Sequence, residues 1–138
     1  MDLKFSCIII DDEESDREEL IKLLADYPEI EIIDQAASGQ DGIKQIEKHQ
    51  PDLIFLDLEM PVMNGFEMFS KLKKQPKVIF MTTLDEGAFK IFEEKGLDYL
   101  VKPFQKSALA KNIAQLKVTH KPLAMPLKNL LEQFKLKL

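Results

Sequence analysis

Five short apolar segments alternate with five helix-like segments along the chain. The apolar segments are almost continuous, which indicates strands buried on both faces rather than one. Such strands occur in parallel sheets, where crossover helices connect neighbouring strands and cover the sheet on both sides. The chain is therefore predicted to be an α/β protein with strands at 5–10, 30–37, 53–58, 78–81 and 98–101 and helices at 15–27, 39–49, 65–74, 86–95 and 106–118.

Local signals mark several of these boundaries. Ser15 followed by Glu18 fits a capping box at the start of the first helix. Pro28 would end that helix, because proline lacks the amide hydrogen that a helix interior needs. Gly96 suits the residue just after the fourth helix, where a left-handed backbone conformation is common.

The length of 138 residues predicts one domain, large enough to fold around a core without disulfides. Its one cysteine, Cys7, falls inside the first apolar segment and is predicted to be a buried hydrophobic residue. No apolar segment is long enough for a secretion signal or a membrane span. We expect a cytoplasmic protein without a membrane partner.

The net charge of −5 conceals an uneven distribution. Residues 1–70 contain 18 acidic and 5 basic side chains, whereas residues 71–138 contain 6 acidic and 14 basic ones. The first half could therefore hold a cation, and the second half could contact nucleic acid. The lysines of the second half are scattered over helices and loops rather than clustered. We therefore expect a solvated surface and no direct nucleic-acid binding by this segment.

Polar residues follow four of the predicted strands. Asp11 and Asp12 follow the first, Asp57 lies at the end of the third, Thr82 follows the fourth and Lys102 follows the fifth. Parallel strands bring their carboxyl ends to one edge of the sheet, where ligands of such folds bind. Three carboxylates, a hydroxyl and an ammonium group are therefore predicted to meet at that edge.

This combination suits phosphoryl chemistry. Three neighbouring carboxylates repel one another and call for a cation, and oxygen-only ligands favour a hard divalent ion such as Mg²⁺. Lys102 and Thr82 could then bind phosphoryl oxygens, and a carboxylate could attack phosphorus to form an acyl phosphate. Stabilisation of the spread negative charge would be the protein's main contribution.

Residues 5–119 resemble the receiver domain of two-component response regulators. The resemblance rests on IDDE at 10–13, DLEMPVMNG at 57–65, Thr82 and YLVKP at 99–103. It implies a flavodoxin-like fold of five strand–helix units with strand order 2-1-3-4-5. It also implies a receiver domain at 1–120, which leaves 121–138 as an extension or linker with a short amphipathic helix.

The resemblance assigns roles to the predicted site residues. Asp57 would be the phosphoacceptor, and Asp11, Asp12, Asp57 and the backbone carbonyl of Glu59 would hold Mg²⁺ or Mn²⁺. The Glu59 side chain would be left free at the rim of the pocket. Gly65 would allow a close approach or an unusual backbone angle in the loop.

The remaining motif residues would bind and sense the phosphoryl group. Thr82 and Lys102 would bind it, and Thr82 and Tyr99 would act as switch residues. The bond between Lys102 and Pro103 is a candidate cis peptide. Thr83 departs from the family, which usually has a small residue there, and it would narrow access to the phosphoacceptor.

The function implied is a phosphorylation-dependent signalling switch. A sensor histidine kinase or phosphotransfer protein would phosphorylate Asp57 with Mg²⁺. The surface made by the segments 86–95, 98–101 and 106–118 would then change to control an output, and it would also offer a homodimer interface. The chain would promote its own phosphotransfer and autodephosphorylation without being a turnover enzyme.

The kind of output and three functions of other classes stay open. One of these is a purely structural scaffold, against which the intact Asp57, Thr82 and Lys102 argue. Segments 77–89 and 97–104 resemble receivers of the LytTR class, so the chain would be either an excised receiver of a DNA-binding transcriptional regulator or a stand-alone receiver. An aspartyl-phosphate phosphatase would need a second aspartate two residues after Asp57, where Glu59 stands. A flavin carrier would need a phosphate loop where the acidic run 11–14 lies.

Overall fold

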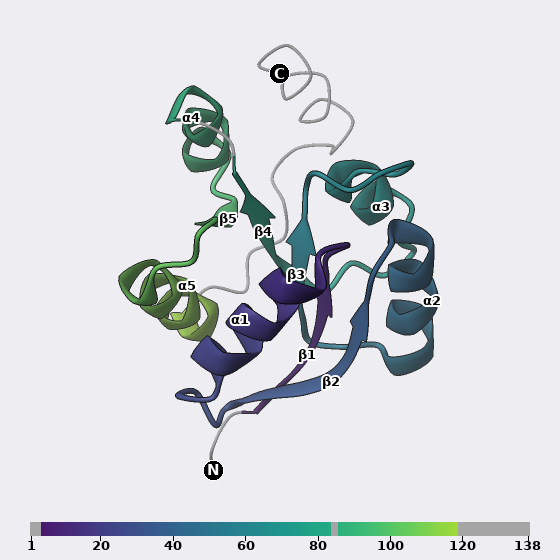
Figure 1. The fold of residues 1–138 in the computed structure, drawn as a ribbon, viewed down its shortest axis with the longest axis horizontal. Helices are drawn as coiled ribbons and strands as arrows, with labels where there is room; N and C mark the ends of the chain where they lie inside the picture. Colours follow the sequence, from purple (N-terminus) through teal and green to yellow (C-terminus); the bar gives the residue numbers. More distant parts are fainter. Residues whose placement is uncertain (1–3, 84–85, 119–138) are drawn as a thin grey trace.

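A single parallel sheet forms the centre of the molecule (Figure 1). The computed structural model describes residues 4–83 and 86–118. The strand order is β2-β1-β3-β4-β5, and every neighbouring pair is parallel, which confirms the predicted flavodoxin-like (βα)5 fold. The strands are β1 (Phe5–Ile10), β2 (Ile30–Ala36), β3 (Leu53–Asp57), β4 (Lys77–Thr82) and β5 (Asp98–Val101).

Helices cover both faces of this sheet (Figure 1). One face packs against two helices, α1 (Glu14–Leu24) and α5 (Lys106–Val118). The other face packs against three, α2 (Gly39–His49), α3 (Gly65–Ser70) and α4 (Glu86–Glu94). Because both faces are covered, every residue of the central strand β3 is buried.

Aromatic side chains fill the core between the sheet and α3 and α4. The Phe66 and Phe80 rings meet edge to face at 4.9 Å between centroids, and Phe69 and Phe92 pack around them. On the opposite face, β1 packs against Leu20 of α1. Cys7 is fully buried in that second core, as predicted, and burial raises the pKa of its thiol.

The helix boundaries differ from the prediction at both ends of α1, at the end of α3 and by one residue at the end of α4. The first helix ends at Leu24 rather than at residue 27, so Pro28 is not the residue that ends it. The first helix begins at Glu14, with Glu13 as its N-cap residue, so the capping box predicted at Ser15 is wrong. The chain turns directly after the first strand, where the Glu13 backbone N–H donates to the Asp11 carboxylate at 2.9 Å. The third helix ends at Ser70 rather than at residue 74.

Other boundaries agree with local chemistry. Ser38 and Asn64 cap α2 and α3 by accepting backbone hydrogen bonds with their side chains. Gly96 follows α4 with φ of +67°, as predicted for the residue after that helix. The extension predicted at 121–138 lies outside the described residues. Among the described helices, none has both the length and the apolar character that a bilayer span requires.

Candidate functional site

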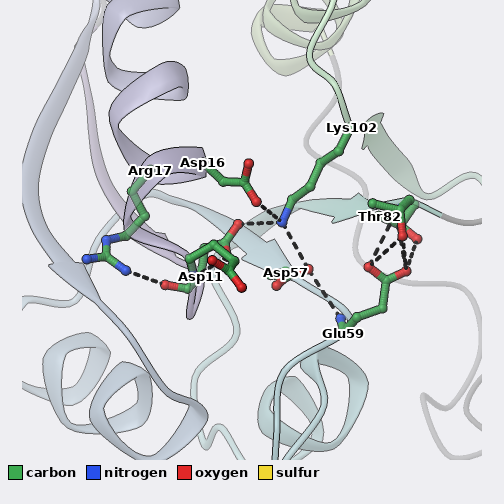
Figure 2. Close-up of polar contacts among 9 residues, drawn as sticks. Asp11, Asp16, Arg17, Asp57, Glu59, Thr82 and Lys102 are labelled. Carbon is green, nitrogen blue, oxygen red and sulfur yellow. Dashed lines mark hydrogen bonds and ion pairs between the residues drawn. The ribbon is translucent and has the colours of Figure 1, made fainter.

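Four strand ends bring the predicted site residues to one edge of the sheet (Figure 2). Carboxylate oxygens of Asp11, Asp12 and Asp57 all lie within 4.8 Å of one another. Asp11 is fully buried and Asp57 is 2% exposed, whereas Asp12 is half-buried. Thr82, at the end of β4, and Lys102, directly after β5, complete the group.

The backbone around Asp57 is closely packed. The Gly65 backbone N–H donates to the Leu58 carbonyl at 3.1 Å, which places the start of α3 against the end of β3. A Cβ atom on Gly65 would lie 2.6 Å from the Asp57 carbonyl oxygen, so only glycine fits without a shift of backbone. The Glu59 backbone N–H donates to Asp57 Oδ1 at 3.2 Å and orients the carboxylate.

Arg17 fixes the position of Asp11. Its Nη1 atom donates to the Asp11 backbone carbonyl at 2.6 Å (Figure 2). Its Nε atom donates to the Gln35 side chain at 3.0 Å. The Asp11 carboxylate accepts from the Glu13 backbone through Oδ1 and forms an ion pair through Oδ2. The first acidic residue of the pocket is therefore held from both its backbone and its side chain.

Lys102 extends into the acidic pocket. Its Nζ atom lies 2.7 Å from Asp11 Oδ2, 3.5 Å from Asp57 Oδ1 and 2.9 Å from Asp16 Oδ2 (Figure 2). Burial lowers the pKa of this ammonium group, but the surrounding carboxylates outweigh burial and raise the pKa above its usual range. The peptide bond from Lys102 to Pro103 is cis, and the Lys102 backbone N–H donates to the Thr82 carbonyl at 2.9 Å.

The Glu59 side chain is engaged, so the prediction that it would be free at the rim of the pocket is wrong. Its carboxylate accepts a hydrogen bond from the Thr82 hydroxyl at 2.8 Å. It also accepts from the backbone N–H of Thr83 at 3.2 Å and from the Thr83 hydroxyl at 3.2 Å (Figure 2). The loop after β3 and the end of β4 are thereby joined by one carboxylate.

The electrostatics of the pocket suit a divalent cation. Burial, followed by the charge of Asp11, raises the pKa of Asp57 to about 7, although Lys102 opposes the shift. The ammonium group of Lys102 therefore does not offset the burial of Asp57 and the charge of Asp11. An all-oxygen donor set of this kind fits Mg²⁺ or Mn²⁺, so Asp11, Asp12 and Asp57 are suitable ligands.

Tyr99 lies on β5 and faces α4 rather than the acidic residues. Its ring stacks on Phe89 at 5.1 Å between centroids and packs against Phe92 at 5.3 Å. Its hydroxyl donates to the Glu93 carboxylate at 3.0 Å. Burial, and then the contact with Glu93, raise the pKa of Tyr99 above its usual range. The predicted switch residue is thus bound to the helix that would carry its signal.

Two residues of the site did not follow from the sequence motifs. Asp16 contacts Lys102, and Arg17 holds Asp11. Spacing along the chain gave no signal for Asp16, because it lies in the first turn of α1 whereas the lysine that it contacts follows β5, 86 residues later. It gave no signal for Arg17 either, since the contact of Arg17 is with a backbone carbonyl that any residue would offer.

The comparisons with known proteins agree with this geometry. Residues 7–114 match the family model described as the response regulator receiver domain. An uncharacterized response regulatory protein of Vibrio cholerae is 41% identical over 128 residues, which cover 88% of this chain and 54% of that protein. The transcriptional regulatory protein BtsR of Escherichia coli is 39% identical over 112 residues, which cover 80% of this chain and 47% of BtsR.

A solved structure gives the same picture. The CheX–CheY–BeF₃–Mg²⁺ complex of Borrelia burgdorferi contains a chain similar to this one, with a TM-score of 0.72 and 26% identity. The match covers 85% of this chain and 92% of that chain. In contrast to that nearly complete match, this chain spans about half the length of the two relatives above.

Proposed function

The chain belongs to the response regulator receiver domain family, and from that premise we propose that it is a phosphorylation-dependent switch in which Asp57 accepts a phosphoryl group. Receiver domains are signalling domains rather than turnover enzymes. The observation that carries the proposal is the cluster of Asp11, Asp12 and Asp57 with Lys102 at the ends of three strands. The aspartyl-phosphate phosphatase alternative lacks such support, because the residue two positions after Asp57 is the glutamate that binds Thr82.

The proposed donor is a phosphohistidine of a sensor histidine kinase or phosphotransfer protein. An Asp57 oxygen forms a bond to phosphorus while the bond from phosphorus to the donor nitrogen breaks, and the electron pair stays on that nitrogen. Mg²⁺ or Mn²⁺, bound by Asp11, Asp12, Asp57 and the Glu59 backbone carbonyl, would supply positive charge to the phosphoryl oxygens.

The protein's own residues orient and stabilise the transferring group. The Glu59 backbone N–H and the packing of Gly65 hold the Asp57 carboxylate in place. Lys102 brings a buried positive charge, and Thr82 brings a hydroxyl, to bind phosphoryl oxygens. Both side chains come from the same sheet as Asp57, because β4 pairs with β3 and β5, which precedes Lys102, pairs with β4.

We further propose that the output surface consists of α4, β5 and α5. Tyr99 links β5 to α4 through Glu93 and Phe89, so a movement of Thr82 on the adjacent strand could change that contact. Such a change would shift the surface between two populations. A homodimer through the same surface belongs to this proposal and rests on the family resemblance. The proposal also includes no direct nucleic-acid binding by this segment, because its lysines are scattered, and a cytoplasmic location.

The class of output has two candidates. One candidate is a receiver that controls transcription, which the similarity to BtsR, a transcriptional regulatory protein, supports. The assignment to the LytTR class with a DNA-binding domain rests on the resemblance of segments 77–89 and 97–104. The other candidate is a stand-alone receiver that signals through its own surface. The length of the encoding open reading frame distinguishes them, because a frame that continues into a DNA-binding domain supports the first candidate and a frame that ends near residue 138 supports the second.

The test of the central proposal is phosphorylation by a small phosphodonor. Acetyl phosphate with Mg²⁺ is expected to add one phosphoryl group to the wild-type chain, as measured by intact-protein mass spectrometry. Asp57→Asn should remain unmodified, since an amide lacks the nucleophilic oxygen. Asp52→Asn is the matched control, because Asp52 is an exposed carboxylate at the opposite end of β3. Labelling of Asp57→Asn to the wild-type level would refute the proposal.

A further inference from the structure

Asp16 is a carboxylate that reaches the site from a helix rather than from a strand end. It is the third residue of α1, and its Oδ2 atom accepts a hydrogen bond from Lys102 Nζ at 2.9 Å. The Asp16 side chain is 28% exposed and that of Lys102 is 9% exposed, so this contact lies at the wall of the pocket rather than on the open surface. Figure 2 shows the Lys102 ammonium group with Asp16 and Asp11 on one side and Asp57 on the other.

The carboxylates that contact Lys102 differ in whether they could also bind a divalent cation. Asp11 and Asp57 belong to the group of three that suits a divalent cation, whereas Asp16 does not. A cation held by Asp11 and Asp57 would compete for the oxygens that now face the ammonium group and would also repel it. Among the described acidic residues that contact Lys102, Asp16 is then the one whose oxygens remain available to it.

We propose that Asp16 is a positioning residue for Lys102, which keeps the ammonium group beside Asp57 when the pocket holds a divalent cation. This inference rests on the proposed function, because it concerns the lysine that would bind the phosphoryl group. A lysine stem has four rotatable bonds, so an ammonium group without an anchor samples many positions. One fixed hydrogen bond to α1 limits that sampling and leaves the other two ammonium hydrogens for phosphoryl oxygens.

Two substitutions of Asp16 separate the effect of its hydrogen-bond acceptor from the effect of its negative charge. Asp16→Ala removes the acceptor, whereas Asp16→Asn keeps an acceptor oxygen and removes the charge. Asp16 also lies in the first turn of α1, where any acid favours the helix. Glu14→Ala is therefore the matched control, since Glu14 is an exposed acid in the same turn.

Two measurements on the full chain test the inference. The first is calorimetric titration with beryllofluoride, a phosphoryl analogue, in saturating Mg²⁺. The second is the rate at which an amine-reactive reagent modifies Lys102 in Mg²⁺, followed by peptide mass spectrometry, which reports the position of the lysine without any phosphotransfer. Urea unfolding of each variant at the same pH confirms that it is folded.

The inference predicts that Asp16→Ala weakens beryllofluoride binding by about fivefold. The amine-reactive reagent should modify Lys102 severalfold faster in this variant than in the wild type. In both measurements Asp16→Asn should give a value between those of Asp16→Ala and the wild type, and Glu14→Ala should give the wild-type value. Equal modification rates in Asp16→Ala and the wild type would overturn the inference, as would an equal effect of Glu14→Ala. Failure of the wild type to bind beryllofluoride would instead count against the proposed function, and the modification rates would still decide the role of Asp16.

Discussion

The Thr82 hydroxyl, which we propose binds a phosphoryl group on Asp57, donates to the Glu59 carboxylate at 2.8 Å. A carboxylate carries negative charge on oxygen, as a phosphoryl group does, so the two compete for the same donor. Thr83 strengthens the hold on Glu59 with its backbone N–H and its hydroxyl. In the resting molecule, Thr82 is therefore engaged by an acceptor other than the one proposed for it.

Replacing Glu59 with alanine should strengthen binding of the phosphoryl analogue. The Thr82 hydroxyl would no longer have to leave a charged acceptor, so we expect beryllofluoride affinity in Mg²⁺ to rise by about threefold to tenfold. The backbone carbonyl of residue 59 is unchanged by the substitution. Calorimetry measures the affinity, and Thr83→Ala, which removes one of several contacts, should give a smaller gain. Unchanged or weaker binding in Glu59→Ala would show that the two acceptors do not compete.

The pKa of Asp57 predicts a pH-dependent stability of the cation-free protein. The folded-state pKa of about 7 exceeds the usual 3.8, so folding favours the protonated acid. Asp57 therefore lowers the free energy of unfolding as pH rises from about 4 to about 7, and this loss persists above pH 7. Asp57→Asn lacks the titrating group, and it should be more stable than the wild type by about 2 kcal/mol at pH 8 in a chelator.

Urea unfolding at two pH values measures this effect. The difference between Asp57→Asn and the wild type should largely vanish at pH 4.5, where the wild-type carboxyl is protonated. Saturating Mg²⁺ should also reduce the difference at pH 8, because the cation offsets the repulsion that raises the pKa. A difference of the same size at both pH values would assign the gain to packing rather than to ionisation.

The buried apolar strands predicted a parallel sheet and the edge of the sheet where the polar residues gather. The strand order was implied by the resemblance to receiver domains rather than by the strands themselves. The sequence also predicted that Gly65 allows either a close approach or an unusual backbone angle. The structure favours the close approach, because a Cβ atom on Gly65 would lie only 2.6 Å from the Asp57 carbonyl oxygen. Motif residues such as Asp11 and Lys102 lie at the same edge of the sheet because parallel strands end there, and the long Lys102 side chain spans the distance between their strands.

The contacts made by long side chains could not be predicted in this way. Glu59 follows β3 and its backbone position was expected, but the direction of its carboxylate depends on which donors the end of β4 offers. Ser15 and Glu18 fitted a capping pattern, yet the turn that Asp11 stabilises starts the helix earlier. Such outcomes depend on competition between neighbouring groups in space, which spacing along the chain does not report.

Gly65→Ala tests the packing of α3 on the phosphoacceptor. The added methyl group would meet backbone atoms of β3, which cannot rotate away, so we expect a loss of about 1–3 kcal/mol in the free energy of unfolding. Because the contact is with Asp57 itself, Mg²⁺ affinity should fall as well. Gly96→Ala is the matched control, since its methyl group meets nothing within 4 Å and only the positive φ is unfavourable. Its Mg²⁺ affinity should be unchanged, and a loss of Mg²⁺ affinity in both variants would contradict this account.

The hydrogen bond from Tyr99 to Glu93 predicts a coupling between α4 and the acidic pocket. If this contact holds the resting position of the ring, Glu93→Gln should weaken it and raise beryllofluoride affinity in Mg²⁺ by about twofold to fivefold. The same substitution should lower the pKa of Tyr99 in a spectroscopic titration, because it removes a negative acceptor. Tyr99→Phe keeps the stacking on Phe89 but lacks the hydroxyl, so adding Glu93→Gln to it should change the affinity no further. An effect of Glu93→Gln that persists in the Tyr99→Phe background would show that Glu93 acts through a route other than this hydrogen bond.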